Sequence, residues 1–491
     1  MPSSDHHRRK TKIVCTIGPA TSSVPALTSL ARAGMDCARL NFSHGTHPEH
    51  LETIRNIRKV SLNLGKQIAI LQDLPGPKFR LGDLKNGSVI LKRGSRVTLV
   101  ADQDEETTNG EIRLPLRQSD LPRYVTPGSA IFFSDGSIRL TIINATKTEI
   151  RCICRTGGQV FSGKGINVPK LHGDFATFTQ QDKDHASFGL RNDVDFIAAS
   201  FVRNSSDIEG VRKFVLQNLP KRVEPPSIIA KIEKREALDD LEGIIRASDV
   251  VMVARGDLGV ENPIERVPLI QKRVISTCNA FAVPVITATQ MLESMVNNPS
   301  PTRAEVTDIA NAIFDGTDAL MLSEETAVGH YPVECVNILN RVALTTERRL
   351  LSTPWERLSS TDGGFDVENA TSLAANQISE DIGADLIVSP TNHWTMIAKI
   401  SRFRPQASII ALTESEKMLR KLHLQWGVYP YRVEKTRDLT ELLDTSLKKL
   451  IEQGLANYGD KVVVACDRVE ISKQMGELLF ILEVRKKQGE S

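Results

Sequence analysis

The chain has 491 residues, of which 40% are hydrophobic and 25% are charged, and its formal net charge is +2. This length predicts two or three domains, and the composition is typical of a soluble globular protein. The near-neutral charge excludes a field that would recruit nucleic acid or an acidic membrane, and no run of about 18 apolar residues predicts a membrane span.

Neither a secretory signal nor a disulfide framework is expected. The basic cluster at residues 8–10 is not followed by an apolar segment. The cysteines are odd in number and scattered, and Cys152 and Cys154 have the wrong spacing for a Cys-x-x-Cys redox or zinc pair. We therefore expect reduced cysteines in a cytoplasmic protein.

Short apolar runs alternate with helix-length segments through most of the chain. Eight such runs lie at residues 12–17, 37–41, 67–72, 195–201, 228–232, 250–253, 283–287 and 319–322. Continuous apolar runs are expected of parallel strands that are covered on both faces. Eight strand–helix units predict a (β/α)8 TIM barrel, with its active site at the C-terminal ends of the strands. A doubly wound open sheet is the alternative.

The third and fourth runs are separated by a stretch of different character. Residues 78–164 are rich in turns, with signals at Asn86-Gly87 and Pro127-Gly128, and short strands such as 96–100 alternate with them. We expect an inserted all-β domain over the barrel mouth, where it can act as a lid that excludes water.

A second α/β block follows a linker-like segment after residue 349. Its expected strands are 384–388, 408–412, 461–465 and 478–484, which predict an open-sheet α/β domain. The expected domain limits are 1–74 for the first part of the barrel, 75–164 for the lid, 165–350 for the second part of the barrel and 351–491 for the C-terminal domain.

Polar residues end several of the predicted barrel strands. The run 250–253 stops at Gly256 and Asp257, while the run 228–232 carries Lys231 and ends in Glu233. Other strand ends deliver Arg39, Asn41, Ser43, Asp73, Thr289, Ser323 and Glu325. A single charged strand end is usually solvated or paired, but the convergence of so many on one rim predicts an active site.

Two carboxylates beside basic residues predict a divalent cation and an anionic substrate. Arginine and lysine clamps with such a cation fit phosphoryl transfer, in which positioning and charge neutralisation provide most of the catalysis. Magnesium is the natural cation, because it needs few carboxylates and keeps room for substrate oxygens and water. No P-loop motif is present, which excludes a P-loop kinase. The segment 256–259 would open a helix whose amides favour an anion such as a substrate carboxylate.

The chain resembles the pyruvate kinase family over the predicted barrel and lid. The resemblance rests on the ordered segments 16–19, 38–45, 73–80, 229–233, 252–259, 288–293, 301–305 and 321–327. It implies magnesium-dependent phosphoryl transfer from phosphoenolpyruvate to ADP (EC 2.7.1.40), giving pyruvate and ATP in the last step of glycolysis. It also implies a homotetramer built through barrel and C-terminal contacts.

The resemblance implies a role for each matching residue. Glu233 and Asp257 would be the ligands of Mg²⁺, or of Mn²⁺ in its place. Lys231 would stabilise the phosphoryl group in flight, and Arg39 would clamp it. The amides of Gly256 and Asp257 would hold the substrate carboxylate together with Thr289, which is also linked to protonation of the enolate through water. The residues that would face the nucleotide are Asn41, His44, Arg80 and Lys164, the last arriving with the lid.

The chain departs from many family members at the monovalent-cation site. Those members hold potassium with groups like Asn41, Ser43, Asp73 and the carbonyl of Leu74, and carry a glutamate where Lys78 stands here. An ammonium supplies the positive charge that the ion would supply, whereas a glutamate adds negative charge that needs neutralisation. We therefore predict activity that does not require potassium.

A second departure lies in the C-terminal domain. In members activated by sugar phosphates, a Ser-Gly loop wraps the effector phosphate before an Arg-Pro pair like Arg404-Pro405. The corresponding stretch, Thr391 to Thr395, lacks that step and carries Trp394. Glycine matters there because backbone amides must approach the phosphate closely. The sequence argues against the usual phosphate pocket and names no other effector.

Two other classes of protein compete with this interpretation. A metal-dependent carbon–carbon lyase on a TIM barrel would also use a Glu/Asp metal pair, but the lid and the clamps Arg39 and Lys231 argue against it. A non-catalytic effector-binding paralogue would not need Lys231, Glu233, Asp257 and Thr289 together.

Overall fold

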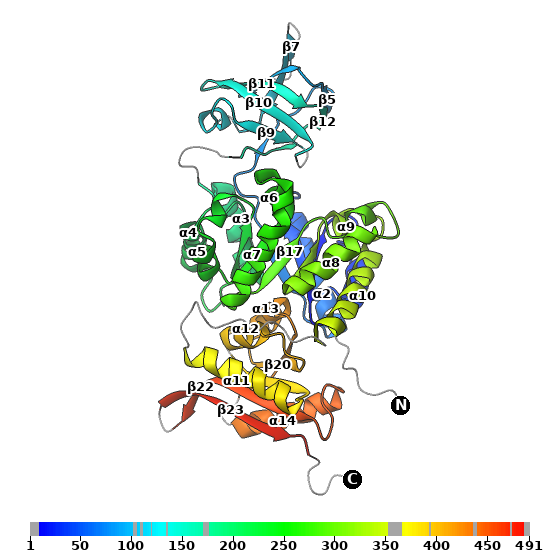
Figure 1. Cartoon of the computed structure of the whole chain (residues 1–491), viewed down its shortest axis with the longest axis vertical. Coiled ribbons are helices and arrows are strands. Elements are labelled where there is room, and N and C mark those ends of the chain that lie inside the picture. Colours follow the sequence, from blue (N-terminus) through cyan, green and yellow to red (C-terminus); the bar gives the residue numbers. More distant parts are fainter. Residues whose placement is uncertain are drawn as a thin grey trace.

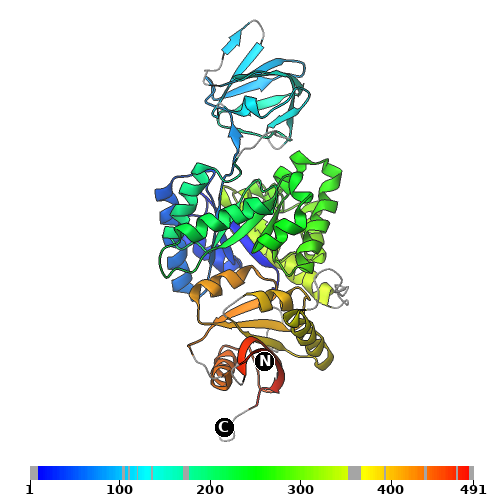
Figure 2. The same cartoon turned by 90° about the vertical axis from the view of Figure 1, so that its left-hand side faces the viewer.

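The computed structural model describes residues 9–101, 106–108, 111–118, 120–133, 136–169, 176–351, 366–391, 394–435, 439–471 and 474–485. These residues form three bodies along the long axis of the molecule: a β domain, a central barrel and an α/β domain (Figure 1). A view from the side shows the β domain and the α/β domain at opposite ends of the barrel (Figure 2). Among the described helices, none combines the length and the apolar character that crossing a bilayer would require.

The central body is a closed barrel of eight parallel strands, which confirms the predicted TIM barrel. Around the barrel the order is β1-β18-β17-β16-β15-β14-β3-β2. The strands are β1 (Lys12–Ile17), β2 (Cys37–Asn41), β3 (Ala69–Asp73), β14 (Phe196–Ala199), β15 (Ser227–Ile232), β16 (Val250–Ala254), β17 (Val285–Ala288) and β18 (Ala319–Leu322). The first strand closes the barrel against the last, with Lys12 opposite Ala319 and Cys15 opposite Leu322.

The fourth barrel strand is shorter than the sequence predicts. It ends at Ala199, whereas the apolar run continues to residue 201. Phe201 adopts φ +57°, a left-handed conformation that a strand does not accommodate. Ser200 is therefore released from the strand onto the barrel rim.

Helices surround the barrel and bury their apolar stripes against its strands. They are α1 (Val24–Ala33), α2 (His47–Leu64), α3 (Gln180–Arg191), α4 (Ser205–Asn218), α5 (Leu241–Ala247), α6 (Arg255–Glu261), α7 (Val267–Ala280), α8 (Arg303–Asp315), α9 (Glu324–Ala327) and α10 (Pro332–Leu351), with the 3-10 turns η2 (Glu236–Leu238), η3 (Ile264–Arg266) and η4 (Glu293–Val296). The sequence fixes their ends: Thr302 and Glu305 form a capping box at the start of α8, and Gly316 ends it in the left-handed conformation.

The inserted domain leaves the barrel directly after β3, and its described residues form β structure and one 3-10 turn, η1 (Leu121–Arg123). Its main sheet has the order β7-β8-β6-β11-β10-β9. The strands of this sheet are β6 (Arg96–Ala101), β7 (Glu106–Thr108), β8 (Glu111–Leu116), β9 (Ala130–Phe133), β10 (Ile138–Ala145) and β11 (Glu149–Thr156). A separate two-stranded sheet is formed by β5 (Ser88–Leu91) and β12 (Gly158–Phe161). A two-stranded ribbon of β4 (Phe79–Arg80) and β13 (Gly165–Ile166) forms its base. The domain has its own apolar core, which includes Leu99 and Ile150.

The C-terminal domain has an open sheet in the order β21-β20-β19-β22-β23. Its strands are β19 (Leu386–Pro390), β20 (Ser408–Thr413), β21 (Val428–Arg432), β22 (Lys461–Ile471) and β23 (Gln474–Glu483), and its helical elements are α11 (Val367–Ile382), α12 (Thr395–Ser401), α13 (Glu416–Lys421), η5 (Leu422–Leu424) and α14 (Leu439–Glu452). All pairs are parallel except β22 with β23. Residues 352–365 of the predicted linker, and residues 392 and 393 of the divergent stretch 391–395, lie outside the described residues.

Residues just before β1 connect the barrel to the C-terminal domain. The ammonium of Lys10 donates to the carbonyls of Pro405, Gln406 and Ala407 at 2.8, 2.8 and 3.1 Å. Leu424 from the C-terminal domain packs into the apolar cluster inside the barrel, and Trp394 packs against the same cluster. The divergent stretch therefore contributes a tryptophan that packs between the two domains.

Candidate active site

Lys231 lies at the centre of a buried charged cluster at the C-terminal end of β15. Its Nζ is 3.1 Å from Oδ1 of Asp73 and 2.9 Å from Oε1 of Glu233. It also donates a hydrogen bond of 2.7 Å to Oγ of Ser200. Burial by itself lowers the pKa of Lys231, but the two carboxylates outweigh burial and raise this pKa above its ordinary value. Lys231 is therefore a fixed cation at neutral pH.

Arg39, on β2, also contacts the carboxylate of Asp73, which lies on the neighbouring strand β3. Its Nη2 and Nε lie 2.7 and 2.8 Å from Oδ2 of Asp73, and its Nη1 donates to Oγ1 of Thr16 at 2.9 Å. Burial raises the pKa of Asp73, yet Lys231 and Arg39 lower it more, so its net pKa lies below the ordinary value. Asp73 is thus an anion that holds both predicted phosphoryl clamps in place.

Glu233 and Asp257, the predicted metal ligands, come from adjacent strand ends. Glu233 is 1% exposed at its side chain, and its Oε2 accepts a hydrogen bond of 2.6 Å from the amide of Phe201. Burial raises the pKa of Glu233, and the negative charge of Asp257 raises it further against the opposing effect of Lys231. A cation beside both carboxylates would offset this repulsion.

The ligands present suit a magnesium ion that shares its coordination shell with water and substrate. They do not form a site that protein ligands alone complete. Among the described residues, no group of three or more His, Cys, Asp or Glu side chains is arranged to hold a metal ion. Mg²⁺ is commonly bound through one or two carboxylates, with water and substrate oxygens completing its shell. Asp257 is 24% exposed at its side chain and so is open to such oxygens.

Thr289 meets the start of α6 across the rim. The amide of Gly256 donates to Oγ1 of Thr289 at 2.9 Å, and that hydroxyl donates to the carbonyl of Ala288 at 2.6 Å. Thr289 adopts φ +70°, and the guanidinium of Arg255 binds its carbonyl, which holds the unusual backbone. The groups predicted to hold a substrate carboxylate therefore lie together.

Comparisons with known proteins agree with this geometry. The family model described as "Pyruvate kinase, barrel domain" matches residues 8–336, and "Pyruvate kinase, alpha/beta domain" matches residues 369–475. A pyruvate kinase of Clostridium acetobutylicum is 41% identical over 460 residues, which cover 93% of this chain and 96% of the relative. The chain belongs to the pyruvate kinase family.

Other relatives support the same assignment. A pyruvate kinase of Bacillus licheniformis is 42% identical over 463 residues, which cover 94% of this chain and 78% of that protein. The crystal structure of a pyruvate kinase from Cryptosporidium parvum superimposes with a TM-score of 0.88 at 34% identity, covering 98% of this chain and 97% of that one. The chain is accordingly a phosphotransferase of the pyruvate kinase class, EC 2.7.1.40.

The residues that the family resemblance assigns to the nucleotide come from two sides. Asn41 is the last residue of β2 and His44 lies in the loop that follows, where Oδ1 of Asn41 accepts from the amide of Ser43 at 3.1 Å. Arg80 lies in the ribbon at the base of the lid and donates to the carbonyl of Gly163 at 3.2 Å, next to Lys164. Partial desolvation, followed by the charge of Arg80, lowers the pKa of His44, which indicates that the lid base and the barrel loop influence each other.

Two of the groups expected around a monovalent cation, the Leu74 carbonyl and the Asp73 carboxylate, have protein partners. The carbonyl of Leu74 accepts a 2.7 Å hydrogen bond from Ser200, and Asp73 pairs with both clamps. Lys78, expected to replace the cation, has its Nζ 3.6 Å from Oδ1 of Asp257. The lysine charge therefore lies beside a predicted metal ligand.

The sequence left four contributors to this site unassigned. Thr16 orients Arg39, Ser200 binds Lys231, the Phe201 amide binds Glu233, and Asn167 donates to Asp257 at 3.3 Å. Ser200 carried a usable signal, since it is a polar residue at the end of an apolar run. Asn167 carried none, because its position depends on the path of the lid.

Glu325, a predicted rim residue, has a structural role in this geometry. The carboxylate of Glu325 accepts hydrogen bonds from the amides of Ser323 at 2.6 Å and Leu292 at 3.0 Å, so it braces the loops after β17 and β18. Oγ of Ser323 is buried without a hydrogen-bond partner among the described residues.

Proposed function

We propose that the chain catalyses magnesium-dependent transfer of a phosphoryl group from phosphoenolpyruvate to ADP, giving pyruvate and ATP. The observation that carries the proposal is the buried bridge in which Asp73 holds Arg39 and Lys231 beside Glu233. Two fixed cations beside two carboxylates suit a group that is highly charged and needs positioning more than covalent chemistry.

Each clamp has a defined part in the proposed transfer. Arg39 and Lys231 bind the non-bridging phosphoryl oxygens and keep the phosphorus in line between the enolate oxygen and the ADP oxygen. Lys231 remains protonated throughout, because its neighbours raise its pKa. Magnesium, when held by Glu233 and Asp257, supplies charge neutralisation for the phosphoryl and enolate oxygens. Mn²⁺ can take the same ligands.

Thr289 and the start of α6 position the rest of the substrate. The amides of Gly256 and Asp257 would donate to the substrate carboxylate, with the Gly256 amide leaving Oγ1 of Thr289. The hydroxyl of Thr289 would turn its proton from the Ala288 carbonyl to the same ligand. The enolate that remains after transfer takes up a proton at its methylene carbon through a water oriented by Thr289, which yields pyruvate.

The nucleotide would bind between the barrel rim and the lid. Asn41 and His44 supply contacts from the barrel, and Arg80 and Lys164 supply positive charge from the base of the lid. We further propose that the active form is a cytoplasmic homotetramer.

Potassium independence is the finer part of the proposal. Lys78 places an ammonium 3.6 Å from Asp257, and the Ser200 hydroxyl occupies the Leu74 carbonyl. In this proposal the ammonium of Lys78 and the hydroxyl of Ser200 take over the charge and the contact that a monovalent ion would supply. Replacing sodium and potassium with a bulky organic cation should leave turnover unchanged within a factor of a few, and a loss above about tenfold would contradict this part.

A coupled assay tests the reaction itself. Phosphoenolpyruvate is supplied with ADP or another nucleoside diphosphate, with and without magnesium, and both pyruvate and ATP are measured. Equal amounts of the two products that depend on magnesium are expected. Pyruvate-like products without ATP would favour a carbon–carbon lyase, and the absence of any product would favour a non-catalytic paralogue.

A further inference from the structure

A groove on the outer surface of the barrel has no part in the proposed reaction. It lies between α3 and α4 and has a volume of about 430 Å³. Its lining includes Phe178, Lys183, Arg203, Asp207, Gly210, Lys213 and Phe214. This volume falls within the usual range for small-molecule sites.

The groove is positively charged. Lys183 from α3, Lys213 from α4 and Arg203 from the preceding loop line it, and among the described lining residues they face one carboxylate, that of Asp207. That carboxylate is already neutralised, because Arg203 Nη2 lies 3.2 Å from it. Within the described part of the chain, neither Lys183 nor Lys213 has an ion-pair partner. An occupant would therefore be an anion.

The remaining wall suits a flat ring. Phe178 and Phe214 meet edge to face with their ring centroids 5.2 Å apart, and both are only partly buried. Aromatic pairs of this geometry accept a further ring by stacking or edge contact. Gly210 stands in the interior of α4, where glycine weakens a helix, and no heavy atom lies within 4 Å of the place its Cβ would take. Packing does not require this glycine, and its effect is to leave room.

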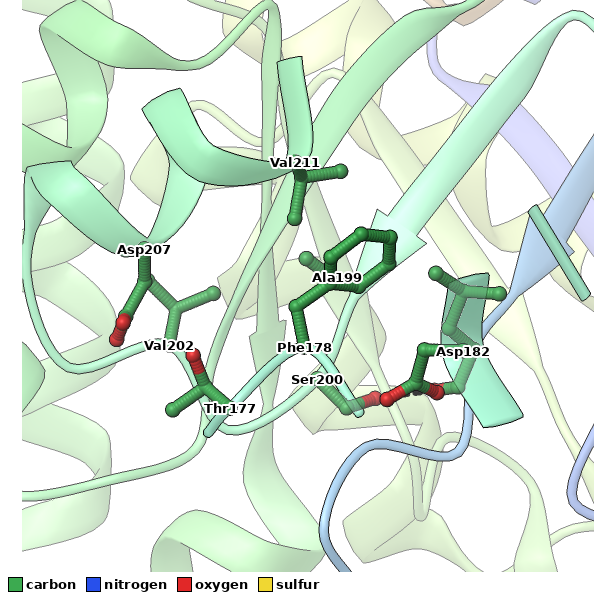
Figure 3. Close-up of a pocket in the computed structure, with 9 residues that line it drawn as sticks. Thr177, Phe178, Asp182, Ala199, Ser200, Val202, Asp207 and Val211 are labelled. Carbon is green, nitrogen blue, oxygen red and sulfur yellow. Dashed lines mark hydrogen bonds between the residues drawn. The ribbon is translucent and has the colours of Figure 1, made fainter. Parts of the chain in front are cut away.

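The same groove reaches towards the active site. Thr177, Phe178 and Asp207 line both the groove and a small inner void, and Leu74 and Ser200 also line that void. Figure 3 shows Phe178 among Ala199 of β14 and Val211 of α4, with Ser200 on the side of Asp182. Ser200 binds Lys231 and Leu74, and the next residue, Phe201, holds Glu233 from a left-handed backbone. Phe178 and Ser200 thus line the same void, and Ser200 contacts Lys231, which gives a displacement of Phe178 a short route to the proposed chemistry.

We propose that the groove between α3 and α4 is an effector site for a small organic anion that bears a planar ring. The anion binds Lys183 and Lys213, its ring packs on Phe178 and Phe214, and its presence alters Lys231 through Phe178 and Ser200. The binding half of this proposal is independent of the proposed reaction, whereas the coupling half rests on it.

Binding is tested by calorimetry on the full chain with two probes that carry different acidic groups, a phosphate and a carboxylate. Adenosine 5′-monophosphate represents phosphates and 2-naphthoate represents carboxylates, with adenosine and 2-naphthamide as the uncharged partners. We expect at least one anion to bind at least about tenfold more tightly than its uncharged partner, because an ammonium pair favours the charge. The stronger probe identifies the acid class, and equal affinity for charged and uncharged partners would overturn the proposal.

Variants localise the binding. The Cβ of Gly210→Phe would meet open space and its ring would occupy the groove, so this variant should weaken probe binding at least about tenfold. Lys183→Met combined with Lys213→Met should have an effect of the same size. Leu216→Phe, at an exposed position of the same helix, and Lys59→Met on α2 are the matched controls. Unchanged affinity in Gly210→Phe would place the probe elsewhere, including the active site, and would refute the groove.

Coupling is measured by steady-state kinetics with the groove saturated. We expect kcat or the KM for phosphoenolpyruvate to change at least about threefold in the wild type, and Phe178→Leu to reduce this change while the probe still binds. A saturated groove with unchanged kinetics would refute the coupling half. An inactive enzyme that still binds the probe in the groove would refute the proposed function and leave the site standing.

Discussion

Lys78 and Asp257 face each other across the junction of lid and barrel, with Nζ 3.6 Å from Oδ1. Both side chains keep contact with solvent, at 30% and 24% exposure, so their attraction is screened and the pair can open. The charge of Lys78, which we expect to replace potassium, therefore also acts on Asp257, which we expect to bind magnesium. The two predictions depend on the same charge.

Lys78→Glu should make the enzyme dependent on potassium. The substitution places a second carboxylate beside Asp257, and the added negative charge needs a cation to neutralise it. In a buffer with only a bulky organic cation, turnover should fall at least about tenfold and should recover when potassium is added. Lys78→Gln, which removes charge without reversing it, is the control. Equal activity of the glutamate variant with and without potassium would contradict the prediction.

Lys231→Met should abolish most turnover without unfolding the barrel. Loss of one preorganised charge that stabilises a transition state costs about 10²- to 10³-fold in kcat. Lys234→Met is a matched control, because Lys234 is a buried lysine three residues along the chain that pairs with Glu261 at 2.5 Å, outside the cluster. Rates and circular dichroism of both variants decide the matter. Full turnover by Lys231→Met would revive the non-catalytic interpretation.

Asp257→Asn should raise the magnesium concentration needed for half-maximal activity. The amide keeps the shape of the side chain but removes the charge that attracts the cation, so apparent affinity should fall about 10- to 100-fold. Glu261→Gln, which loses an acid of the neighbouring pair, serves as the comparison. Magnesium titrations at saturating substrate measure the effect, and a lower kcat with unchanged magnesium affinity would assign Asp257 to another role.

Gly76→Ala should cost more stability than Gly65→Ala, although both glycines have left-handed backbones, with φ of +64° and +60°. A Cβ at residue 76 would lie 2.9 Å from the Phe201 ring and 3.0 Å from Cβ of Ser200, whereas nothing lies within 4 Å at residue 65. Overpacking adds about 1–3 kcal/mol to the backbone strain that the two variants share. Thermal unfolding compares them, and kcat should fall only in Gly76→Ala. Equal melting temperatures would show that the rim loops yield freely.

Acid should destabilise the interface between barrel and C-terminal domain through His423. Burial, with a smaller contribution from Lys12, lowers the pKa of His423 from 6.5 to about 4, and its Nδ1 donates to the Leu419 carbonyl. The folded state therefore favours neutral imidazole. Stability from this group is complete above pH 6.5 and declines as the pH falls towards 4, because the unfolded chain takes up the proton first.

Unfolding of the wild type and of His423→Gln across that range measures the effect. The slope of the unfolding free energy against pH reports the number of protons taken up on unfolding, and this number should be smaller in the variant by up to about one. His330→Gln, at an exposed position, is the control. Identical slopes in the wild type and the His423 variant would contradict the assignment.

The barrel could be predicted because each of its strands is an apolar run, which needs no knowledge of partners. The same criterion missed β21, in which Tyr429, Pro430 and Tyr431 are only partly buried and give no continuous apolar run. It also extended β14 to Phe201, because apolarity carries no information about a left-handed backbone.

The candidate site shows a similar division. Arg39, Lys231 and Glu233 stand at strand ends, and the barrel topology alone brings them to one rim. The bridge by Asp73 between the two clamps depends on side-chain geometry across neighbouring strands. The contact of Asn167 with Asp257 depends on the return path of the lid. Such contacts cannot be predicted from residue type and strand order.

The pairing of β1 with β18 also sets the order in which the molecule can mature. Lys12 leaves the ribosome more than three hundred residues before its partner Ala319. At ordinary translation speeds this interval is on the order of tens of seconds. Throughout that time one edge of an apolar strand waits without its neighbour, so a nascent chain of this architecture should depend on early cover for that edge, whether from its own helices or from a chaperone.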